Sequence, residues 1–319
     1  MSKKVLVMGG SYFIGKKIVD VLLDNNYNVY TLNRGSKENH NEKVTNLICD
    51  RYNENDMRKI LENYDFEIII DVCGLDKTSS EILLKSINKE SIEKFIFISS
   101  SAVYDIEHIK IPFKEDDALG RDKYWWDYGT NKIEAEKCYI QAFENTNTDL
   151  IILRPPYIYG ENNYAQRESF IFNHLENDLP IIVPNKGETK LQFLYTEDLA
   201  NIIIKLISEE VSSLAIFNVG NKKAVTVREW IEACGIAINK KPIIKEFNYE
   251  EHNKGVRDFF PFHDYDNVLD VSKINNYYNE EIDFIEGLRR AYKWYCHEKS
   301  NIVFKENVTK NEEEILKNF

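Results

Sequence analysis

The sequence has few cysteines, fewer positive than negative charges, and no long apolar run. Its five cysteines stand far apart and form no C-x-x-C pair, which argues against a disulfide framework or a zinc site and predicts reduced thiols. No stretch approaches about 18 consecutive apolar residues, so no membrane span is predicted. The first residues pass from two lysines into an apolar stretch too short for a signal peptide. We therefore expect a cytoplasmic protein.

Positive charge is in deficit, with 41 Lys and Arg against 53 Asp and Glu and a formal net charge of −12. A phosphate backbone repels such a chain, so nucleic acid and anionic membrane surfaces are disfavoured as partners. A phosphorylated cofactor can still bind, because backbone amides and one or two cations suffice. The six histidines show no metal-ligand spacing, and we expect no metal.

The first half of the chain alternates short β-branched runs with amphipathic stretches, within 319 residues of which 43% are hydrophobic. Continuous apolar strands separated by helices predict a parallel sheet covered on both faces, wound right-handed into a doubly wound α/β Rossmann sheet. The expected strands are 4–8, 28–32, 46–48, 67–72, 94–99 and 150–153, and the expected helices are 14–25, 56–63, 79–87 and 131–144.

After Pro155-Pro156 this rhythm is lost, and the next segment is rich in aromatic and polar residues. A strand–helix–strand pattern returns from residue 191 and is expected to rejoin the sheet. The sequence therefore predicts a discontinuous second lobe that binds substrate. The predicted domains are 1–155 with 191–222 for the dinucleotide-binding domain, and 156–190 with 223–319 for the substrate lobe.

The first expected strand ends in a glycine-containing loop, and a helix follows at once. Unpaired amides and the helix dipole at such a point attract a pyrophosphate. Tyr12 stands where the pattern Gly-x-x-Gly-x-x-Gly has a glycine, so the loop is reshaped or the ring flanks the cofactor. The alternative is a tight βα turn that binds no dinucleotide. The predicted phosphate loop is Gly9-Gly10-Ser11-Tyr12-Phe13-Ile14-Gly15.

The second strand ends in Asn33-Arg34, where an NAD-selective enzyme usually has an acidic residue that binds the adenosine ribose. Asn33 does not repel a 2′-phosphate and Arg34 can pair with one, so NADP is predicted, with NAD as the alternative. Arg34 is otherwise a solvated turn residue. Further cofactor contacts are expected at the ends of later strands, from Asp50, Arg51, Cys73, Gly74, Ser99 and Pro155.

A Tyr-x-x-x-Lys pair, Tyr128 and Lys132, follows an expected strand end that carries three serines. At this spacing the two side chains share one helix face, and an ammonium beside a phenol lowers the phenol pKa. Tyr128 can then exchange a proton with a substrate alcohol. Ser100 is the expected hydroxyl donor, although serines at a strand end also form turns. Two other such pairs, at 12/16 and 295/299, lack these surroundings.

These ordered motifs resemble the extended short-chain dehydrogenase/reductase superfamily, in particular its NAD-dependent epimerase/dehydratase group, over nearly the whole chain. The resemblance places the catalytic Ser/Thr on Ser100, the base on Tyr128, and the lysine that also holds the nicotinamide ribose on Lys132. Residues 8–15, 32–35 and 260–264 look like an atypical branch that includes chloroplast stem-loop RNA-binding proteins. The remaining motifs are Ser99–Tyr104, Leu153–Gly160, Phe193–Ala200 and Phe217–Gly220.

The chain also departs from the family pattern. Ser101-Ala102 occupies the place of the acidic pair found in 4,6-dehydratases, so a dehydratase is disfavoured. Tyr157 stands where sugar-nucleotide epimerases usually have Asn, and Leu191 where they often have Arg. The stretch between residues 71 and 95 is too short for the usual dimer helix, which leaves a monomer or a homodimer open.

Together these features predict an NAD(P)-dependent epimerase or reductase. It would transfer a hydride at a hydroxyl or keto carbon of a sugar-like or nucleotide-sugar substrate, with Tyr128 as the base. The alternative is a non-catalytic protein on the same fold that binds RNA or senses the cofactor.

Overall fold

The computed structural model describes residues 2–36 and 41–317 of the chain, which divide into two compact units. Unit 1 comprises Met1–Pro156, Thr196–Gly220 and Leu269–Glu280, and unit 2 comprises Tyr157–Tyr195, Asn221–Val268 and Glu281–Phe319. The prediction placed 191–195 in the first domain and 269–280 in the second, and the structure assigns each to the other unit. Residues 193–195 pair with 157–159, and Leu269 bridges to Phe113. Both pairings join residues distant in sequence.

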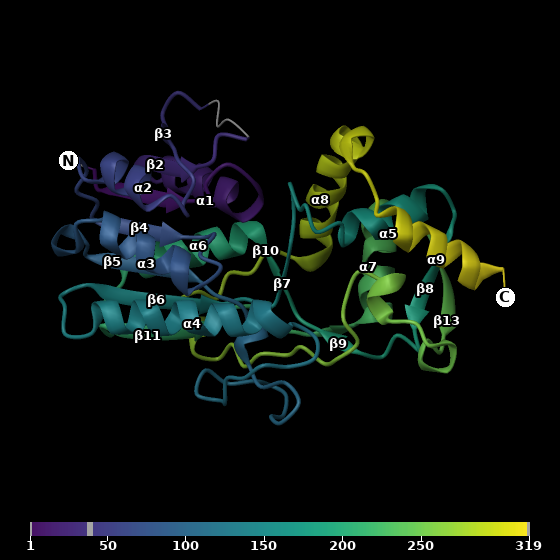
Figure 1. Cartoon of the computed structure of the whole chain (residues 1–319). Coiled ribbons are helices and arrows are strands. Elements are labelled where there is room, and N and C mark those ends of the chain that lie inside the picture. The colour runs from purple at the N-terminus through teal and green to yellow at the C-terminus, as the bar shows by residue number, and fades with distance from the viewer. Residues whose placement is uncertain (1, 37–40, 318–319) are drawn as a thin grey trace. The chain divides into compact units, whose positions relative to one another are not determined.

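Within the described residues of unit 1, seven parallel strands form one sheet in the order β11-β6-β5-β4-β1-β2-β3 (Figure 1). The central strands β4 and β5 are buried along their full length, as apolar runs in a two-faced parallel sheet should be. The predicted doubly wound Rossmann sheet is confirmed. The strands are β1 (Lys4–Met8), β2 (Asn28–Asn33), β3 (Thr45–Ile48), β4 (Ile68–Asp71), β5 (Lys94–Ile98), β6 (Asp149–Arg154) and β11 (Leu214–Asn218).

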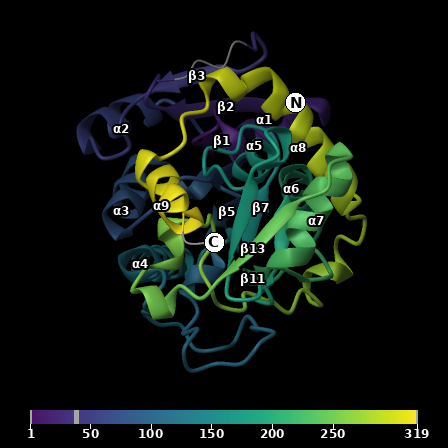
Figure 2. The ribbon, with the colours of Figure 1, turned by 90° about the vertical axis from the view of Figure 1, so that its right-hand side faces the viewer.

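Helices cover both faces of this sheet (Figure 2). One face carries α1 (Phe13–Asp24) and α6 (Thr196–Ser208), which pack against each other. The other carries α2 (Glu54–Leu61), α3 (Lys77–Ser86) and α4 (Trp126–Phe143) in a row. Asn53 and Asp76 cap α2 and α3 by accepting hydrogen bonds from backbone amides three residues on, as N-cap side chains do.

Helix α4 begins at Trp126, five residues before its predicted start at 131. The reason is Asp122, whose Oδ1 accepts hydrogen bonds from the amides of Tyr124 and Trp125, at 2.7 and 2.8 Å. These bonds form a turn that leads into the helix. The earlier start places Tyr128 inside the first turns of α4, on the same helix as Lys132.

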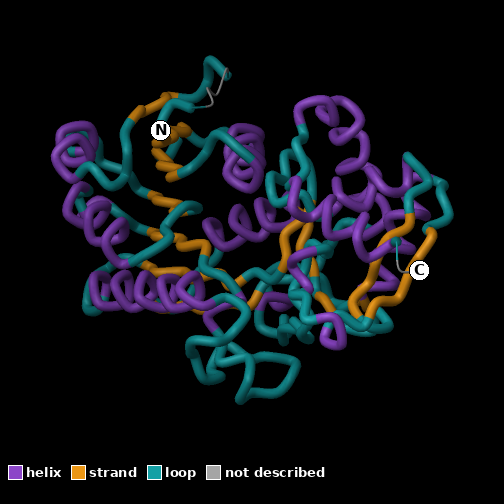
Figure 3. The backbone as a smooth tube through the Cα atoms, turned by 45° about the vertical axis from the view of Figure 1, so that its right-hand side comes forward, coloured by secondary structure: helices purple, strands orange, loops and turns teal. Residues whose placement is uncertain are grey.

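Unit 2 consists mainly of helices, joined by short two-stranded pairs (Figure 3). Its core is aromatic: the Phe193 and Trp230 rings stack with centroids 5.6 Å apart, and Phe262 meets Trp230 edge-on at 4.8 Å. The sequence predicted no regular pattern over 157–184, yet this segment contains two strands and a helix. The elements are β7 (Tyr157–Tyr159) with β10 (Phe193–Tyr195), β8 (Pro180–Pro184) with β13 (Ile243–Phe247), β9 (Lys190–Leu191) with β12 (Val225–Thr226), α5 (Glu168–Glu176), α7 (Val227–Ile238), α8 (Phe284–Glu298) and α9 (Glu306–Leu316).

None of the helices in residues 2–36 and 41–317 is both long enough and apolar enough to span a membrane.

Candidate active site

The candidate site lies at the carboxyl edge of the unit 1 sheet. β1, β4 and β5 are adjacent strands that run in the same direction, so the segments after them meet at one edge. These segments are the glycine loop, Cys73-Gly74 and Ser99–Ser101. The glycine loop and Cys73 lie in contact, because a Cβ added at Gly9 would be 3.0 Å from the Cβ of Cys73. Three segments separated by many residues in the sequence therefore converge.

The glycine loop makes a turn that only glycine permits at two points. Gly9 has φ of +87°, in the region that L-residues rarely adopt. A Cβ at Gly15 would overlap the carbonyl oxygen of Gly9. The first turn of α1 therefore packs so tightly against the end of β1 that only glycine fits at this position. Tyr12, at the N-cap, has extended backbone and makes no side-chain capping bond, and the first turn of α1 holds no acidic residue. The helix N-terminus is thus suited to an anion.

At the end of β2, Asn33 and Arg34 lie side by side in a turn. Asn33 Oδ1 accepts a hydrogen bond of 2.9 Å from the amide of Gly35, while the Arg34 side chain is exposed. Nearby, Lys16 pairs with Asp20 at 3.0 Å and Lys17 with Glu197 at 3.3 Å. Both lysines are therefore engaged with carboxylates of helices α1 and α6.

Asp50 and Arg51, two of the predicted cofactor contacts, have different surroundings. Asp50 is exposed, and its Oδ1 accepts a hydrogen bond from the amide of Tyr52 at 3.0 Å. Arg51 is buried, and its guanidinium pairs with both carboxylate oxygens of Asp71, at 2.9 and 3.0 Å. The same guanidinium donates to the Cys73 thiol at 3.0 Å. Arg51 thus ties the end of β3 to the end of β4.

Asp71 is the centre of this buried cluster, which the sequence analysis missed. Besides Arg51, it accepts a hydrogen bond of 2.5 Å from the Tyr139 hydroxyl and one of 3.2 Å from the amide of Cys73. Burial by itself raises the pKa of the Asp71 carboxyl, but the charge and hydrogen bonds of Arg51 outweigh burial and lower it. The sequence did contain a signal for this cluster: Asp71 ends the otherwise apolar run Ile68–Ile70, and a buried carboxylate needs a charged or hydrogen-bonding partner.

Lys132, the lysine of the predicted catalytic set, is almost fully buried. Its Nζ donates hydrogen bonds to the carbonyls of Gly74 at 2.7 Å and Ile98 at 2.8 Å, so it joins the ends of β4 and β5. It also lies 4.7 Å from the centre of the Phe97 ring. Burial lowers the pKa of Lys132 to about 8, although the charge of Asp71 opposes this shift. The ammonium group is therefore held in place by backbone geometry.

Tyr128 lies one helical turn before Lys132 on α4, and its side chain is 40% exposed. Its ring tilts against Trp125, with centroids 5.7 Å apart. A Cβ at Gly129 would overlap the carbonyl oxygen of Ala102, so the start of α4 packs directly on the segment that follows Ser100. Ser100 is half-buried, and its Oγ accepts a hydrogen bond of 3.2 Å from the amide of Ala102. The three predicted catalytic residues thus come from contacting segments of one unit.

Ser99 and Pro155 make hydrogen bonds that hold the site segments in place. The Ser99 hydroxyl donates to Glu136 at 2.5 Å, and Glu136 in turn pairs with Arg154 through two bonds of 2.7 and 3.0 Å, all buried. The carbonyl oxygen of Pro155 accepts a hydrogen bond of 2.8 Å from the amide of Ser101. Ser99 therefore directs its hydroxyl into the protein. Glu136, four residues after Lys132, is a second buried acid that sequence reasoning missed.

The described residues contain no group of three or more His, Cys, Asp or Glu side chains that could hold a metal ion. The two positions where the sequence departs from epimerases, Tyr157 and Leu191, are buried in unit 2. The Tyr157 ring meets Phe262 edge-on at 4.8 Å, which accounts for an aromatic residue there.

Curated relatives resemble the chain over most of its length. The chloroplast stem-loop binding protein of 41 kDa b of Arabidopsis thaliana is 29% identical over 310 residues, covering 91% of this chain and 78% of that protein. A putative UDP-glucose 4-epimerase of Methanocaldococcus jannaschii is 26% identical over 316 residues, covering 91% and 97%.

Solved structures share the fold. The UDP-glucose 4-epimerase of Thermotoga maritima with UDP-glucose has a TM-score of 0.76 at 19% identity, covering 92% of this chain and 99% of that one. The UDP-N-acetylglucosamine 4-epimerase of Methanobrevibacter ruminantium has a TM-score of 0.77 at 22% identity, covering 93% and 99%. Residues 5–220 match the sequence profile of one family. The chain therefore belongs to the NAD dependent epimerase/dehydratase family.

Proposed function

We propose that this protein is an NAD(P)-dependent epimerase or reductase that transfers a hydride at a hydroxyl or keto carbon of a nucleotide-sugar. The observation that carries the proposal is the placement of Tyr128 and Lys132 one turn apart on α4, at the sheet edge that also holds the glycine loop. Related proteins named as UDP-glucose 4-epimerases support the substrate class.

Each residue of the set has a distinct role in this proposal. Lys132, held by two carbonyls, supplies the positive charge that favours the Tyr128 phenolate. Tyr128, exposed on one side, takes the proton of the substrate hydroxyl. Ser100 donates a hydrogen bond to the oxygen as it becomes a carbonyl. An epimerase keeps the keto form and returns the hydride to its other face, whereas a reductase makes the alcohol and releases it.

The residues present fit a dinucleotide. Gly9 and Gly15 permit the tight turn from β1 into α1. Tyr12 does not cap the N-terminus of α1 with its side chain, so backbone amides there can bind a pyrophosphate. When bound, the nicotinamide accepts and returns the hydride. Asp50, Cys73 and Gly74 would line its path along the sheet edge, while Arg51 and Ser99 act behind this edge through Asp71 and Glu136.

We expect the protein to prefer NADP over NAD because of Arg34. Its exposed guanidinium at the end of β2 can pair with a 2′-phosphate, and Asn33 beside it carries no negative charge. Structural neighbours have been solved with NAD, so NAD is the alternative. Arg34→Glu should weaken NADPH binding about tenfold or more while leaving NADH binding nearly unchanged.

Titration of nicotinamide fluorescence measures both affinities. Lys59→Glu, the same charge reversal on an exposed residue of α2, serves as the control and should change neither. Equal or tighter binding of NADH by the wild-type protein would contradict the role of Arg34.

The activity itself can be followed by proton NMR of the sugar. With NAD(P)⁺ and UDP-glucose or a related nucleotide-sugar, an epimerase inverts one carbinol centre, while with NAD(P)H a reductase converts a keto-sugar to its alcohol. We expect one of these products and no loss of water, because Ser101-Ala102 offers no carboxylate beside Ser100. A 4-keto-6-deoxy product would show that the protein is a dehydratase and contradict this expectation. The test is needed because the human dTDP-D-glucose 4,6-dehydratase is 22% identical to this chain.

A second candidate function comes from the Arabidopsis relative, whose name describes stem-loop binding. The net charge of −12 opposes it. A gel-shift titration with a structured RNA at physiological salt separates the two proposals. A complex that survives competitor RNA, together with no turnover of any nucleotide-sugar, would favour the binding function.

A further inference from the structure

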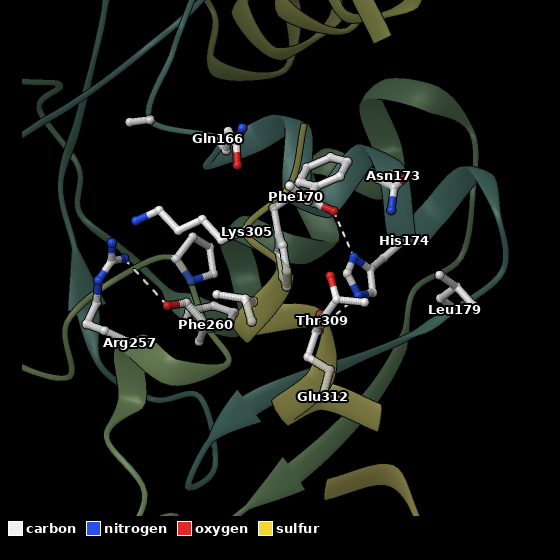
Figure 4. Close-up of a pocket in the computed structure, with 14 residues that line it drawn as sticks. Gln166, Phe170, Asn173, His174, Leu179, Arg257, Phe260, Lys305, Thr309 and Glu312 are labelled. Atoms are coloured by element: carbon white, nitrogen blue, oxygen red, sulfur yellow. Dashed lines mark hydrogen bonds and ion pairs between the residues drawn. The ribbon is translucent and has the colours of Figure 1, made fainter. Parts of the chain in front are cut away.

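Unit 2 contains a pocket whose lining residues have no role in the proposed reaction. It lies among α5, the loop that follows residue 256, and the segment that leads into α9 (Figure 4). The pocket has a volume of about 120 Å³ and is partly open to solvent. A cavity of about 150 Å³ is large enough to bind benzene, so this pocket suits a small ligand. All of its lining residues belong to unit 2.

Two cations lie on one side of this pocket. Figure 4 shows the charged ends of Arg257 and Lys305 pointing to the same region, away from His174 and Glu312. His174 and Glu312 already satisfy each other, at 3.0 Å, and His174 also bonds the carbonyl of Phe170 at 2.8 Å. Arg257 donates to the carbonyl of Phe260 at 3.5 Å. Across the described part of the chain, no carboxylate pairs with Arg257 or Lys305.

The positive charge extends beyond the two cations. Arg167, in the turn before α5, lies over the ring of Tyr157 at 4.7 Å from its centre. Burial, together with the charges of Arg257 and Arg167, lowers the pKa of His263 to about 4. Burial is the larger cause of this shift, and the two guanidinium groups add to it.

Part of the remaining wall is apolar, although Gln166, Asn173 and Thr309 also line the pocket. Phe170 and Phe260 are buried, and Phe304, Val308 and Pro261 complete this surface. Flat rings against a flat ligand give favourable offset or edge-on contacts. The pocket therefore combines a hydrophobic surface with two cations at one end, which matches a ligand with an apolar body and a compact anionic group.

We propose that this pocket binds a small phosphate ester, with its phosphate on Arg257 and Lys305 and its flat apolar body against Phe170, Phe260 and Phe304. A phosphate is favoured because a guanidinium and an ammonium together match a group of nearly two negative charges. Tyr128, Lys132 and the glycine loop are not among the residues that line the pocket. This proposal stands whether or not the proposed reaction is correct.

Phenyl phosphate is the probe, and isothermal titration measures its binding. Phenol offers the same ring without the charge, and inorganic phosphate the same charge without the ring. We expect phenyl phosphate to bind at least about tenfold more tightly than either, because only it contacts both parts of the pocket. Binding no tighter than that of inorganic phosphate would refute the proposal.

Matched variants locate the site. Lys305→Met keeps a long side chain and removes one charge just before α9. Lys310→Met removes one charge from α9 itself, outside the pocket, where Lys310 pairs with Glu306. Lys305→Met and Arg257→Gln should each weaken phenyl phosphate binding about tenfold, and Lys310→Met should not. Thermal melting verifies that each variant folds.

Wild-type affinity in the double variant Lys305→Met/Arg257→Gln would overturn the proposal. Competition with UDP-glucose then identifies the source of the phosphate. Displacement of phenyl phosphate assigns the pocket to a substrate's own phosphates, and persistence assigns it to a separate phosphate ester. Both results support a phosphate site.

Discussion

Tyr128→Phe is expected to lower the turnover of the nucleotide-sugar substrate by about two to four orders of magnitude. The variant loses only the hydroxyl that exchanges the proton, while the ring keeps its contact with Trp125. Lys132 remains anchored to the carbonyls of Gly74 and Ile98. Cofactor affinity should therefore change by no more than about twofold, because the glycine loop and sheet edge are untouched.

The chain offers a matched control for this variant. Tyr295 and Lys299 have the same Tyr-x-x-x-Lys spacing, but they lie in unit 2, where Lys299 pairs with Glu176 at 3.0 Å. Tyr295→Phe should leave turnover close to that of the wild type. Turnover and cofactor titration are measured on all three proteins. Undiminished turnover in Tyr128→Phe would remove Tyr128 from the mechanism, and a parallel loss in both variants would indicate a structural cause.

Asp71→Asn is expected to lower the free energy of unfolding by about 3–5 kcal/mol, since removing one partner of a buried ion pair leaves the other charge uncompensated. Arg51, which pairs with Asp71 at 2.9 and 3.0 Å, would remain buried against a neutral amide. The pKa of Asp71 is lowered in the folded protein, so the stabilisation is present at neutral pH and is lost as the pH falls through the folded-state pKa. The deficit should therefore be largest near neutral pH and shrink in acid.

Urea unfolding followed by circular dichroism measures this difference at two pH values. Tyr139→Phe removes one hydrogen bond to Asp71 and keeps the charge pair, so it should cost only about 1–2 kcal/mol. Glu54→Gln breaks exposed pairs with Arg58 and Lys85, and it should cost less than about 1 kcal/mol because each is a surface pair. If Asp71→Asn were no more destabilising than Glu54→Gln, the buried cluster would not support the sheet edge.

The sequence alone predicted the fold and the positions of the site segments. The glycine loop, Cys73-Gly74 and Ser100 each follow the end of a strand, and because parallel neighbours end at one edge, strand order brings them together. The shared face of Tyr128 and Lys132 follows from helical spacing. These features depend on local periodicity and on turns that few residue types permit, and both are visible in the sequence.

The partners of the buried charges were decided only by the tertiary structure. Arg51 was predicted only as a cofactor contact, and it pairs with Asp71, 20 residues later, while Ser99 bonds Glu136 across 37 residues. The pocket around Arg257 and Lys305 likewise brings together residues distant in sequence. A charged side chain can pair with many residues along the chain, and packing alone selects which one lies within hydrogen-bonding distance once water is excluded.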